Sequence, residues 1–258
     1  LGRLIGILSG VVLVFILLYF NYIKKVVFNF NKERLINSLS IGIPLLLNSV
    51  VSIIIDYSDR IILAKYLPMS AVGTYSLAYT GGGLMRVFIN SFNTTWGPML
   101  YDLLDSNEED KYLVVKRNFT YFIGTISFVC LIGQLFSKEL ITLILPQNYN
   151  GTIVFVPYIL VGMIFFGGYH FIVNIIVYHK KTKIIPIINF LSALTNILIN
   201  IWFIPKYGSI VAVISTIISY FLSNLLLLIW IQVKYKYYKF NYIKIILALI
   251  LVFNPFLF

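Results

Sequence analysis

Charged residues and cysteine are both scarce in this sequence. Only 11% of the 258 residues are charged, whereas 60% are hydrophobic and the mean hydropathy is +0.92. A soluble globular domain has about 25% charged residues, so this class is excluded. The single cysteine, Cys130, has no partner in the sequence, which excludes a disulfide framework and a cysteine-based metal site. The composition predicts an integral membrane protein.

Long polar segments are also lacking. The longest one, residues 101–117, is acidic and then basic, and no glycine-rich or proline-rich linker occurs. The outer loops leave little room for catalytic groups, so we expect that the protein is not an enzyme, with a membrane polymerase, ligase or acyltransferase as the alternative. His170 and His179 have no third ligand nearby, so we expect neither a metal site nor a cofactor.

Long apolar runs, in contrast, are abundant. A helix needs roughly 20 apolar residues to cross the hydrocarbon core of a bilayer. The runs are continuously apolar and do not alternate with polar residues, as the strands of a membrane barrel do. The predicted fold class is therefore all-α, a polytopic membrane helical bundle of about eight transmembrane helices. The candidate spans are residues 1–20, 35–57, 71–98, 118–145, 153–178, 184–204, 209–232 and 242–258.

Lysine and arginine are distributed unevenly among the loops. The loops 21–34, 99–117, 179–183 and 233–240 hold thirteen of them, and the opposite loops hold four. Because cytoplasmic loops carry an excess of these residues, the first set is predicted to be cytoplasmic. This topology explains most of the net charge of +11, so nucleic-acid binding is not expected. Basic residues beside a membrane can also hold anionic lipid head groups.

Arg86 falls close to the middle of the predicted span 71–98. A charge at that depth costs roughly 2.5–3.5 kcal/mol on insertion scales, so the side chain must face protein or water. Asn90 and Asn93 follow Arg86 at spacings of four and three, and Trp96 lies just beyond. This polar stripe predicts a water-filled cavity, with polar contacts between helices as the alternative. The guanidinium keeps its charge, so an anionic substrate group or a buried acid would satisfy it.

A second group of charges, Asp56, Asp59 and Arg60, lies near the outer end of the predicted span 35–57. Asp56 and Arg60 are four residues apart, and Asp59 is three residues from Asp56, so all three can meet on one face of a helix. The spacing predicts a local ion cluster at a helix end.

Four stretches, in this order, resemble a known family: the polysaccharide-export or oligosaccharide flippase branch of the multidrug/oligosaccharidyl-lipid/polysaccharide exporter superfamily. Their spacing, order and topology agree over essentially the whole chain. The stretches are "IPLLLNSVVSIIIDYSDRIILAKYLPMSAVGTYSLAY", with Pro44, Asp59-Arg60 and Val72-Gly73-x-Tyr75; "NTTWGPMLYD", with Trp96-x-Pro98; "NYNGTIVFVPYILVG"; and "YHKKTKIIPIINFLSALTNILINIWFIPKYG", ending at Pro205-x-x-Gly208.

This resemblance implies a flippase that moves an oligosaccharide linked to a polyprenyl diphosphate across the membrane for surface polysaccharide synthesis. Such transporters work by alternating access, with one bundle rocking against the other. A diphosphate needs a fixed positive charge and several donors, which suits Arg86. The sugar hydroxyls would suit Asn90, Asn93 and Trp96. On the same view Asp56, Asp59 and Arg60 would form an outer gate, or one of the two acids would couple transport to a cation.

The resemblance also implies the second half of a two-bundle transporter. Residues 1–34 would hold the last helix of the first bundle and a cytoplasmic linker, residues 35–232 a six-helix bundle, and residues 233–258 the start of an additional helix. The expected location is the bacterial cytoplasmic (inner) membrane, and the expected partners are the lipid-linked oligosaccharide, membrane lipids and a polysaccharide polymerase of the lipopolysaccharide or capsule pathway. Alternatives are a multidrug antiporter or a flippase for the cell-wall lipid precursor, both of the same fold, and a non-transporting scaffold in which a protein acid pairs with Arg86.

Overall fold

The computed structural model describes residues 2–22, 30–238 and 240, and helices make up 89% of this part, with no strand in it. The all-α fold class is therefore confirmed. In order along the chain, the elements are α1 (Gly2–Asn21), α2 (Lys32–Tyr66), α3 (Met69–Asp105), α4 (Lys111–Leu135), α5 (Ser137–Ile144), the 3₁₀ helix η2 (Gln147–Val154), α6 (Val156–Tyr178), α7 (Ile184–Tyr207) and α8 (Ile210–Lys234).

Five helices of the described chain are long and apolar enough to cross a membrane, namely α2, α4, α6, α7 and α8. The predicted count of about eight is not confirmed. α3 is long enough at 37 residues, but it carries the polar residues that surround Arg86, and the apolar part of α1 is a shorter stretch, Ile5–Asn21. The last predicted span, 242–258, lies outside the described residues.

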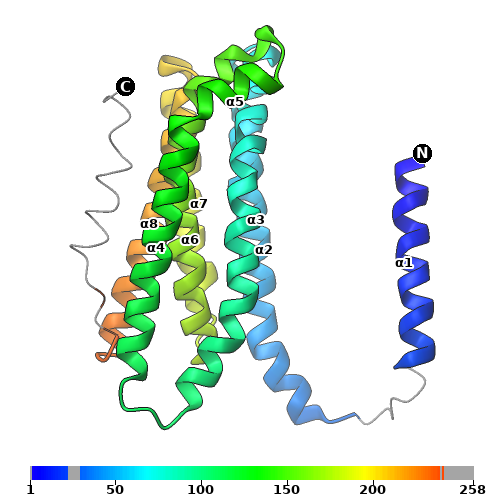
Figure 1. The fold of residues 1–258 in the computed structure, drawn as a ribbon, viewed down its shortest axis with the longest axis vertical. Coiled ribbons are helices and arrows are strands. Elements are labelled where there is room, and N and C mark those ends of the chain that lie inside the picture. Colours follow the sequence, from blue (N-terminus) through cyan, green and yellow to red (C-terminus); the bar gives the residue numbers. More distant parts are fainter. Residues whose placement is uncertain (1, 23–29, 239, 241–258) are drawn as a thin grey trace. The chain divides into compact units, whose positions relative to one another are not determined.

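The chain divides into two compact units, Leu1–Ser40 and Ile41–Phe258. The first contains α1 and the beginning of α2. The second contains the rest of α2 and the helices from α3 to α8, which form the bundle that we describe below (Figure 1). The division into 1–34, 35–232 and 233–258 stays a prediction.

Two boundaries differ from those expected. The span predicted to end at residue 57 continues as α2 to Tyr66, because Asp56, Asp59 and Arg60 all find partners within the bundle and need not lie at its end. The run 118–145 divides into α4 and α5, which are separated at Phe136.

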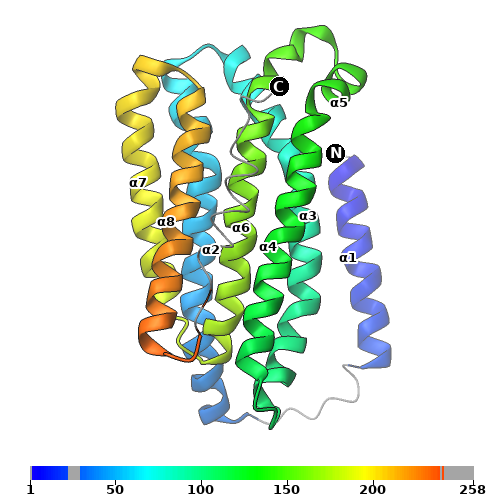
Figure 2. The same cartoon turned by 60° about the vertical axis from the view of Figure 1, so that its left-hand side comes forward.

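Helix α6 is the centre of the bundle. It packs against α3, α4 and α8, and α8 in turn packs against α7 (Figure 2). Thirteen of its 23 residues are buried. Gly167 and Gly168 allow the close approach of neighbours, because a Cβ atom at Gly167 would meet Ile126 of α4 and one at Gly168 would meet Asn224 of α8.

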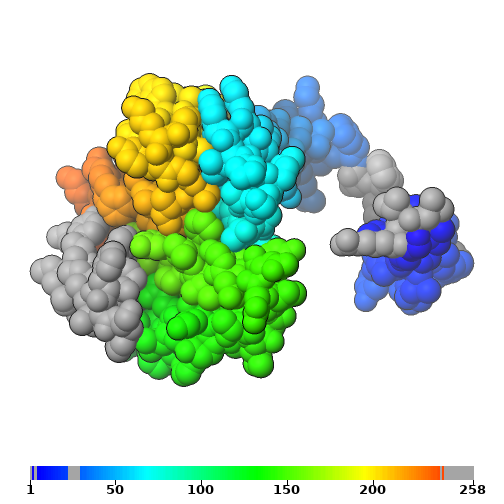
Figure 3. Space-filling view, turned by 90° about the horizontal axis from the view of Figure 1, so that it is seen from above, coloured from blue at the N-terminus to red at the C-terminus, as the bar shows by residue number. Residues whose placement is uncertain are grey.

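The predicted outer end of the bundle is formed by three connections. The α7–α8 connection, the α2–α3 turn and the segment containing α5 and η2 lie there in neighbouring sectors (Figure 3). The opposite end carries the 106–110 turn between α3 and α4 and the 179–183 turn between α6 and α7, whose lysines predict a cytoplasmic location.

Candidate functional site

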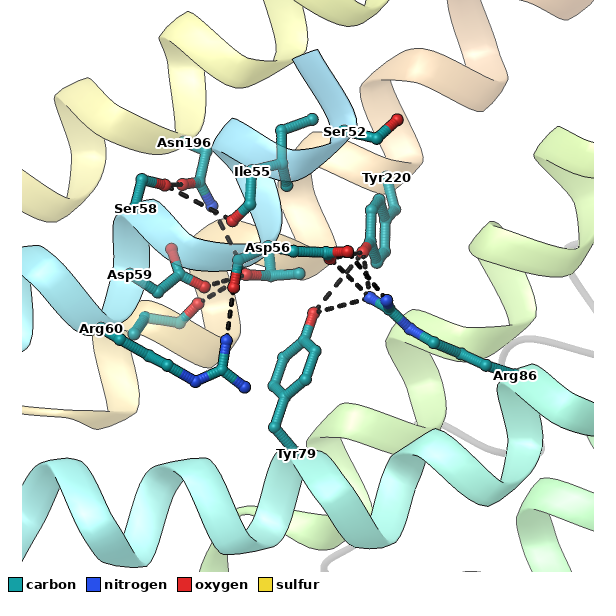
Figure 4. A network of polar contacts seen from close by, with 12 residues as sticks. Ser52, Ile55, Asp56, Ser58, Asp59, Arg60, Tyr79, Arg86, Asn196 and Tyr220 are labelled. Atoms are coloured by element: carbon teal, nitrogen blue, oxygen red, sulfur yellow. Dashed lines mark hydrogen bonds and ion pairs between the residues drawn. The ribbon is translucent and has the colours of Figure 1, made fainter. Parts of the chain in front are cut away.

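Arg86 of α3 forms an ion pair with Asp56 of α2 inside the bundle (Figure 4). The pair is bidentate: Nη1 donates to Oδ2 at 2.9 Å, and Nη2 donates to Oδ1 at 2.7 Å. Two flat N–H donors facing two carboxylate oxygens make one of the stronger ion pairs in proteins. The side chains are 23% exposed for Arg86 and 29% exposed for Asp56, so the pair is only partly shielded from its surroundings.

Aromatic side chains surround this pair. The hydroxyl of Tyr220 accepts a hydrogen bond from Arg86 Nη2 at 2.8 Å and lies 3.3 Å from Asp56 Oδ1, to which it can donate. Tyr79 accepts a longer bond from the same nitrogen at 3.4 Å. The guanidinium carbon lies 5.0 Å from the ring centre of Phe166 and 5.4 Å from that of Tyr79, close enough for cation–π attraction.

This arrangement decides between two options that the sequence left open. Of an anionic substrate group and a buried acid, the structure provides the acid, Asp56, so the guanidinium is not simply open to water. The geometry is the one expected of the scaffold alternative. It also corrects the predicted cluster, because the Asp56 carboxylate pairs with Arg86, which is 30 residues away, and not with Arg60.

Arg60 has other partners. Its Nη1 donates to the backbone oxygen of Asp56, its Nε donates to Ser76 at 3.2 Å, and its guanidinium carbon lies 5.3 Å from the ring centre of Tyr79. It makes no ion pair with Asp59. The three charges of the predicted outer cluster therefore lie in one region of α2, but each has its own set of partners, and of the three only Asp56 is in an ion pair with another described residue.

A polar cavity of about 120 Å³ lies beside the ion pair. By volume it has room for about four water molecules at about 30 Å³ each. Asn48 of α2, Tyr169 of α6 and Asn189 of α7 form a hydrogen-bonded group in its wall. The other lining residues are Ser52, Ile55 and Asp56 of α2, Phe166, His170 and Val173 of α6, and Tyr220 and Ser223 of α8.

Asp59 occupies a separate, fully enclosed site. The side chain is 1% exposed and accepts hydrogen bonds from Tyr75 at 2.7 Å, from Asn200 at 2.6 Å and from Thr216 at 2.9 Å. Asn196 continues this network by donating to Ser215 and Thr216. In the described chain no cation pairs with Asp59. A buried carboxylate with neutral partners alone is costly as a full charge, so this site favours a bound proton or cation.

The other residues of the predicted stripe do not share the Arg86 site. Asn90 is exposed, and Asn93 accepts a hydrogen bond from Asn174 of α6 at 2.6 Å. Trp96 is buried against Phe171, with 5.0 Å between ring centres, and its Nε1 has no hydrogen-bond partner in the described chain. The stripe therefore does not line one continuous cavity.

Sequence reasoning missed the residues that complete both sites. Tyr79 and Tyr220 carry no charge and stand in apolar runs, and Tyr75 was noted only within the stretch Val72-Gly73-x-Tyr75. Asn196 and Asn200 are four residues apart, which places them on one face of a helix but indicates no partner on another helix. Tyr220 lies in the middle of the predicted apolar span 209–232. A tyrosine hydroxyl at that position needs a hydrogen-bond partner, and this feature of the sequence could have indicated Tyr220.

Residues 1–104 match a protein family described as "Polysaccharide biosynthesis protein". The matched segment contains every residue that the sequence proposed for the site. An uncharacterized membrane protein of Methanocaldococcus jannaschii is 25% identical over 225 residues, which cover 84% of this chain and 44% of the relative. The chain thus spans less than half of that relative's length. No solved structure matches.

The chain resembles polysaccharide biosynthesis proteins. Together with the five apolar helices of the described residues, the likeness to a membrane protein supports a multi-pass membrane protein.

Proposed function

We propose that this chain is part of a flippase that moves polyprenyl-diphosphate-linked oligosaccharides across the bacterial cytoplasmic membrane by alternating access. The product would pass to a polysaccharide polymerase for surface polysaccharide synthesis. The observation that carries the proposal is a permanent positive charge deep in the bundle, held by a single carboxylate beside a polar cavity. The match of residues 1–104 to polysaccharide biosynthesis proteins supports the substrate class.

In this proposal Asp56 is an exchangeable partner of Arg86. Its two carboxylate oxygens occupy the two N–H groups that a phosphate would bind in the same bidentate manner. A diphosphate brings more negative charge than one carboxylate, so it can displace Asp56 when the substrate head group arrives. The cavity beside Asp56 gives the displaced carboxylate a hydrated place to move to.

The exchange leaves a carboxylate without its cation, and this provides a way to couple transport to an ion. Asp56 would take up a proton or a metal cation once Arg86 has turned to the substrate, because an isolated charge at this depth is unfavourable. Asp59 is the second candidate for coupling, since its neutral surroundings already favour a bound proton or cation. Arg60 remains a candidate for an outer gate, through its contacts with Ser76 and with the backbone of Asp56 and not through Asp59.

The three residues predicted to bind sugar hydroxyls, Asn90, Asn93 and Trp96, lie in different surroundings. Asn90 is exposed and free to meet sugar hydroxyls, whereas Asn93 would have to release Asn174 before binding a sugar. Trp96 lies on another side of α3 and joins the sugar site only if the helices rearrange.

One observation favours a second candidate function, a cation-coupled multidrug antiporter. The enclosed acid Asp59 lacks a cationic partner in the described chain, as a site for a proton or metal ion would. The fixed charge of Arg86 argues against a cationic drug in the same cavity, and so the flippase is preferred.

Binding of a polyprenyl diphosphate lipid to the full-length protein in nanodiscs tests the proposal. Arg86→Ala should abolish binding. Asp56→Asn should strengthen it about tenfold, which corresponds to about 1.4 kcal/mol, because the internal competitor of the phosphate is removed. Asp102→Asn removes an exposed acid of the same helix as Arg86 and serves as the matched control, with unchanged affinity.

If Arg86→Ala and Asp56→Asn both leave the affinity unchanged and only lower stability, the pair is a static scaffold element and the flippase proposal fails. Export of surface polysaccharide in cells, with the variants at normal membrane levels, gives the second readout. There Arg86→Ala should stop export.

A further inference from the structure

A long groove runs along the bundle between α3 and α4, on a different side of α3 from Arg86. It consists of an outer section of about 590 Å³ and an inner section of about 310 Å³. Phe88 lines both sections, so they meet at this residue. The groove exists because α3 and α4 both pack against α6, while Gly81 presents no side chain to fill the space between them.

Apolar surface makes up most of the lining of both sections. The outer section is walled almost entirely by hydrocarbon, including Leu84 and Leu140, and lies beneath the exposed apolar residues of α5. The inner section combines Phe92 with polar groups from both helices, namely Trp96, Thr95, Asn118 and Thr125.

Trp96 forms part of the wall of the inner section. Trp96 is 6% exposed, and its indole Nε1 has no acceptor in the described chain. Nε1 is itself buried, so a molecule in the groove would meet other atoms of Trp96. Arg117 is exposed one helical turn from Tyr121, another residue of the inner section, in the direction of the predicted cytoplasmic end. A phosphate held by Arg117 would lie on the same face of α4 as Tyr121.

We infer that this groove is a docking site for the polyprenyl carrier lipid, an inference that rests on the proposed function. The phosphate lies at Arg117 with Asn118 beside it, and the isoprenoid chain continues past Trp96 and Phe88 into the outer section. The site is separate from Arg86 and holds the carrier before its head group reaches the cavity.

The length of the groove selects a polyprenyl chain over a phospholipid chain. The lining residues of α3 run from Met99 to Leu77, which is 22 residues or about 33 Å of helix. One leaflet contributes about half of a hydrocarbon core of about 30 Å, so an acyl chain anchored at the inner interface ends near Phe88. A single chain that fills both sections must be about twice as long.

Tryptophan fluorescence tests the site in the full-length protein. The double variant Trp202→Phe, Trp230→Phe leaves Trp96 as the only reporter among the tryptophans of this chain. Any tryptophan in the remainder of the protein is replaced in the same way. Reconstituted in vesicles of brominated phospholipid, Trp96 is quenched by chains that enter the groove. A long-chain polyprenyl phosphate should displace them and restore the emission, whereas geranyl phosphate, with the same head group and a short chain, should not.

Matched variants locate the two ends of the ligand. Arg117→Gln should raise the concentration of polyprenyl phosphate needed for half-recovery about tenfold, and Lys116→Gln, its neighbour on another face of α4, should leave it unchanged. Thr125→Phe should fill the inner section and abolish recovery, whereas Gly124→Phe adds the same ring one residue away, outside the groove. Arg117 is exposed, so its variant tests the site without disturbing the packed core.

Emission that is not restored by the long-chain lipid would show that ordinary phospholipid occupies the groove and would overturn the inference. Equal recovery with geranyl phosphate would do the same, because chain length would then be irrelevant. These results are separable from the flippase test: Arg86→Ala stops export in the proposed function but leaves recovery at Trp96 intact. A protein that exports normally, yet shows no recovery, keeps its function and loses only this site.

Discussion

The ion pair between Arg86 and Asp56 should behave as a coupled unit in stability measurements. We consider Arg86→Gln, Asp56→Asn and the double variant, which remove the charges one at a time. Asp56→Asn conserves the side-chain volume, and Arg86→Gln removes two heavy atoms but keeps a polar N–H donor. Each single change leaves one charge facing neutral partners, chiefly the hydroxyl of Tyr220. The double change leaves two amides that can bond to each other.

The structure sets the size of the expected effect. Removing one member of a fully buried ion pair costs about 3–5 kcal/mol, because an uncompensated charge is left behind. Arg86 is 23% exposed and Asp56 is 29% exposed, and a polar cavity lies beside them, so partial hydration lowers the cost to about 2–3 kcal/mol. The double variant loses the pair but carries no bare charge. We therefore expect a coupling energy of about 2 kcal/mol.

Reversible unfolding of the reconstituted protein, followed for all four proteins of the cycle, measures this coupling. The pair Asp102 and Lys111, near the α3–α4 turn, serves as a reference cycle with no ion pair between its members in the described chain. A coupling energy below about 0.5 kcal/mol would mean that the two losses add independently, and the description of Asp56 as the partner of Arg86 would be refuted.

Three further outcomes follow from other contacts. Asp59→Asn should change the free energy of unfolding by less than about 1 kcal/mol and remove the dependence of transport on an ion gradient, whereas a large loss of stability would indicate that Asp59 is charged in the resting protein. Gly168→Val should destabilise the bundle by about 2–3 kcal/mol in the same unfolding assay because its side chain meets Asn224 of α8, and Gly124→Val, which meets nothing, should not. Burial lowers the pKa of His179, so the unfolded chain takes up a proton first as the pH falls below about 6.5; thermal stability should decline from that pH downward, and His179→Gln should remove the decline.

The helical fold and the importance of Arg86 could be predicted from the sequence for a simple physical reason. Apolar runs of bilayer length can form few structures other than helices, and a guanidinium inside such a run is expensive enough to be noticed. Residues near it in sequence were predicted as its companions, because the spacing of three and four applies within a single helix. Of the three predicted companions of Arg86, Asn90 is exposed. Asn93 is partly buried and Trp96 is buried, but they contact Asn174 and Phe171 and not Arg86.

The partners of Arg86 and Asp59 could not be predicted in the same way. Asp56 and Tyr220 reach Arg86 from α2 and α8, and Asn200 and Thr216 reach Asp59 from α7 and α8. Such pairings depend on the relative rotation of helices, which a single sequence does not encode in any local pattern. The predicted salt bridge of Asp56 with Arg60 was wrong for this reason: a local partner was available, and a distant one had better geometry.

Helix α2 differs from its neighbours in what holds it in place. The residues of its apolar stretch are mostly exposed. Ile55 and Leu63 join the hydrophobic core, and polar links to the bundle lie at Asn48, at Asp56 and at Ser58 with Asp59. Apolar packing does not change when a proton or an ion binds, but these links do, because two of the three levels contain a carboxylate. A change of charge at Asp56 or Asp59 therefore acts directly on the attachment of α2. For a transporter this arrangement is useful, since the two acids that would sense the substrate or the ion also contribute contacts that hold α2 to α3, α7 and α8.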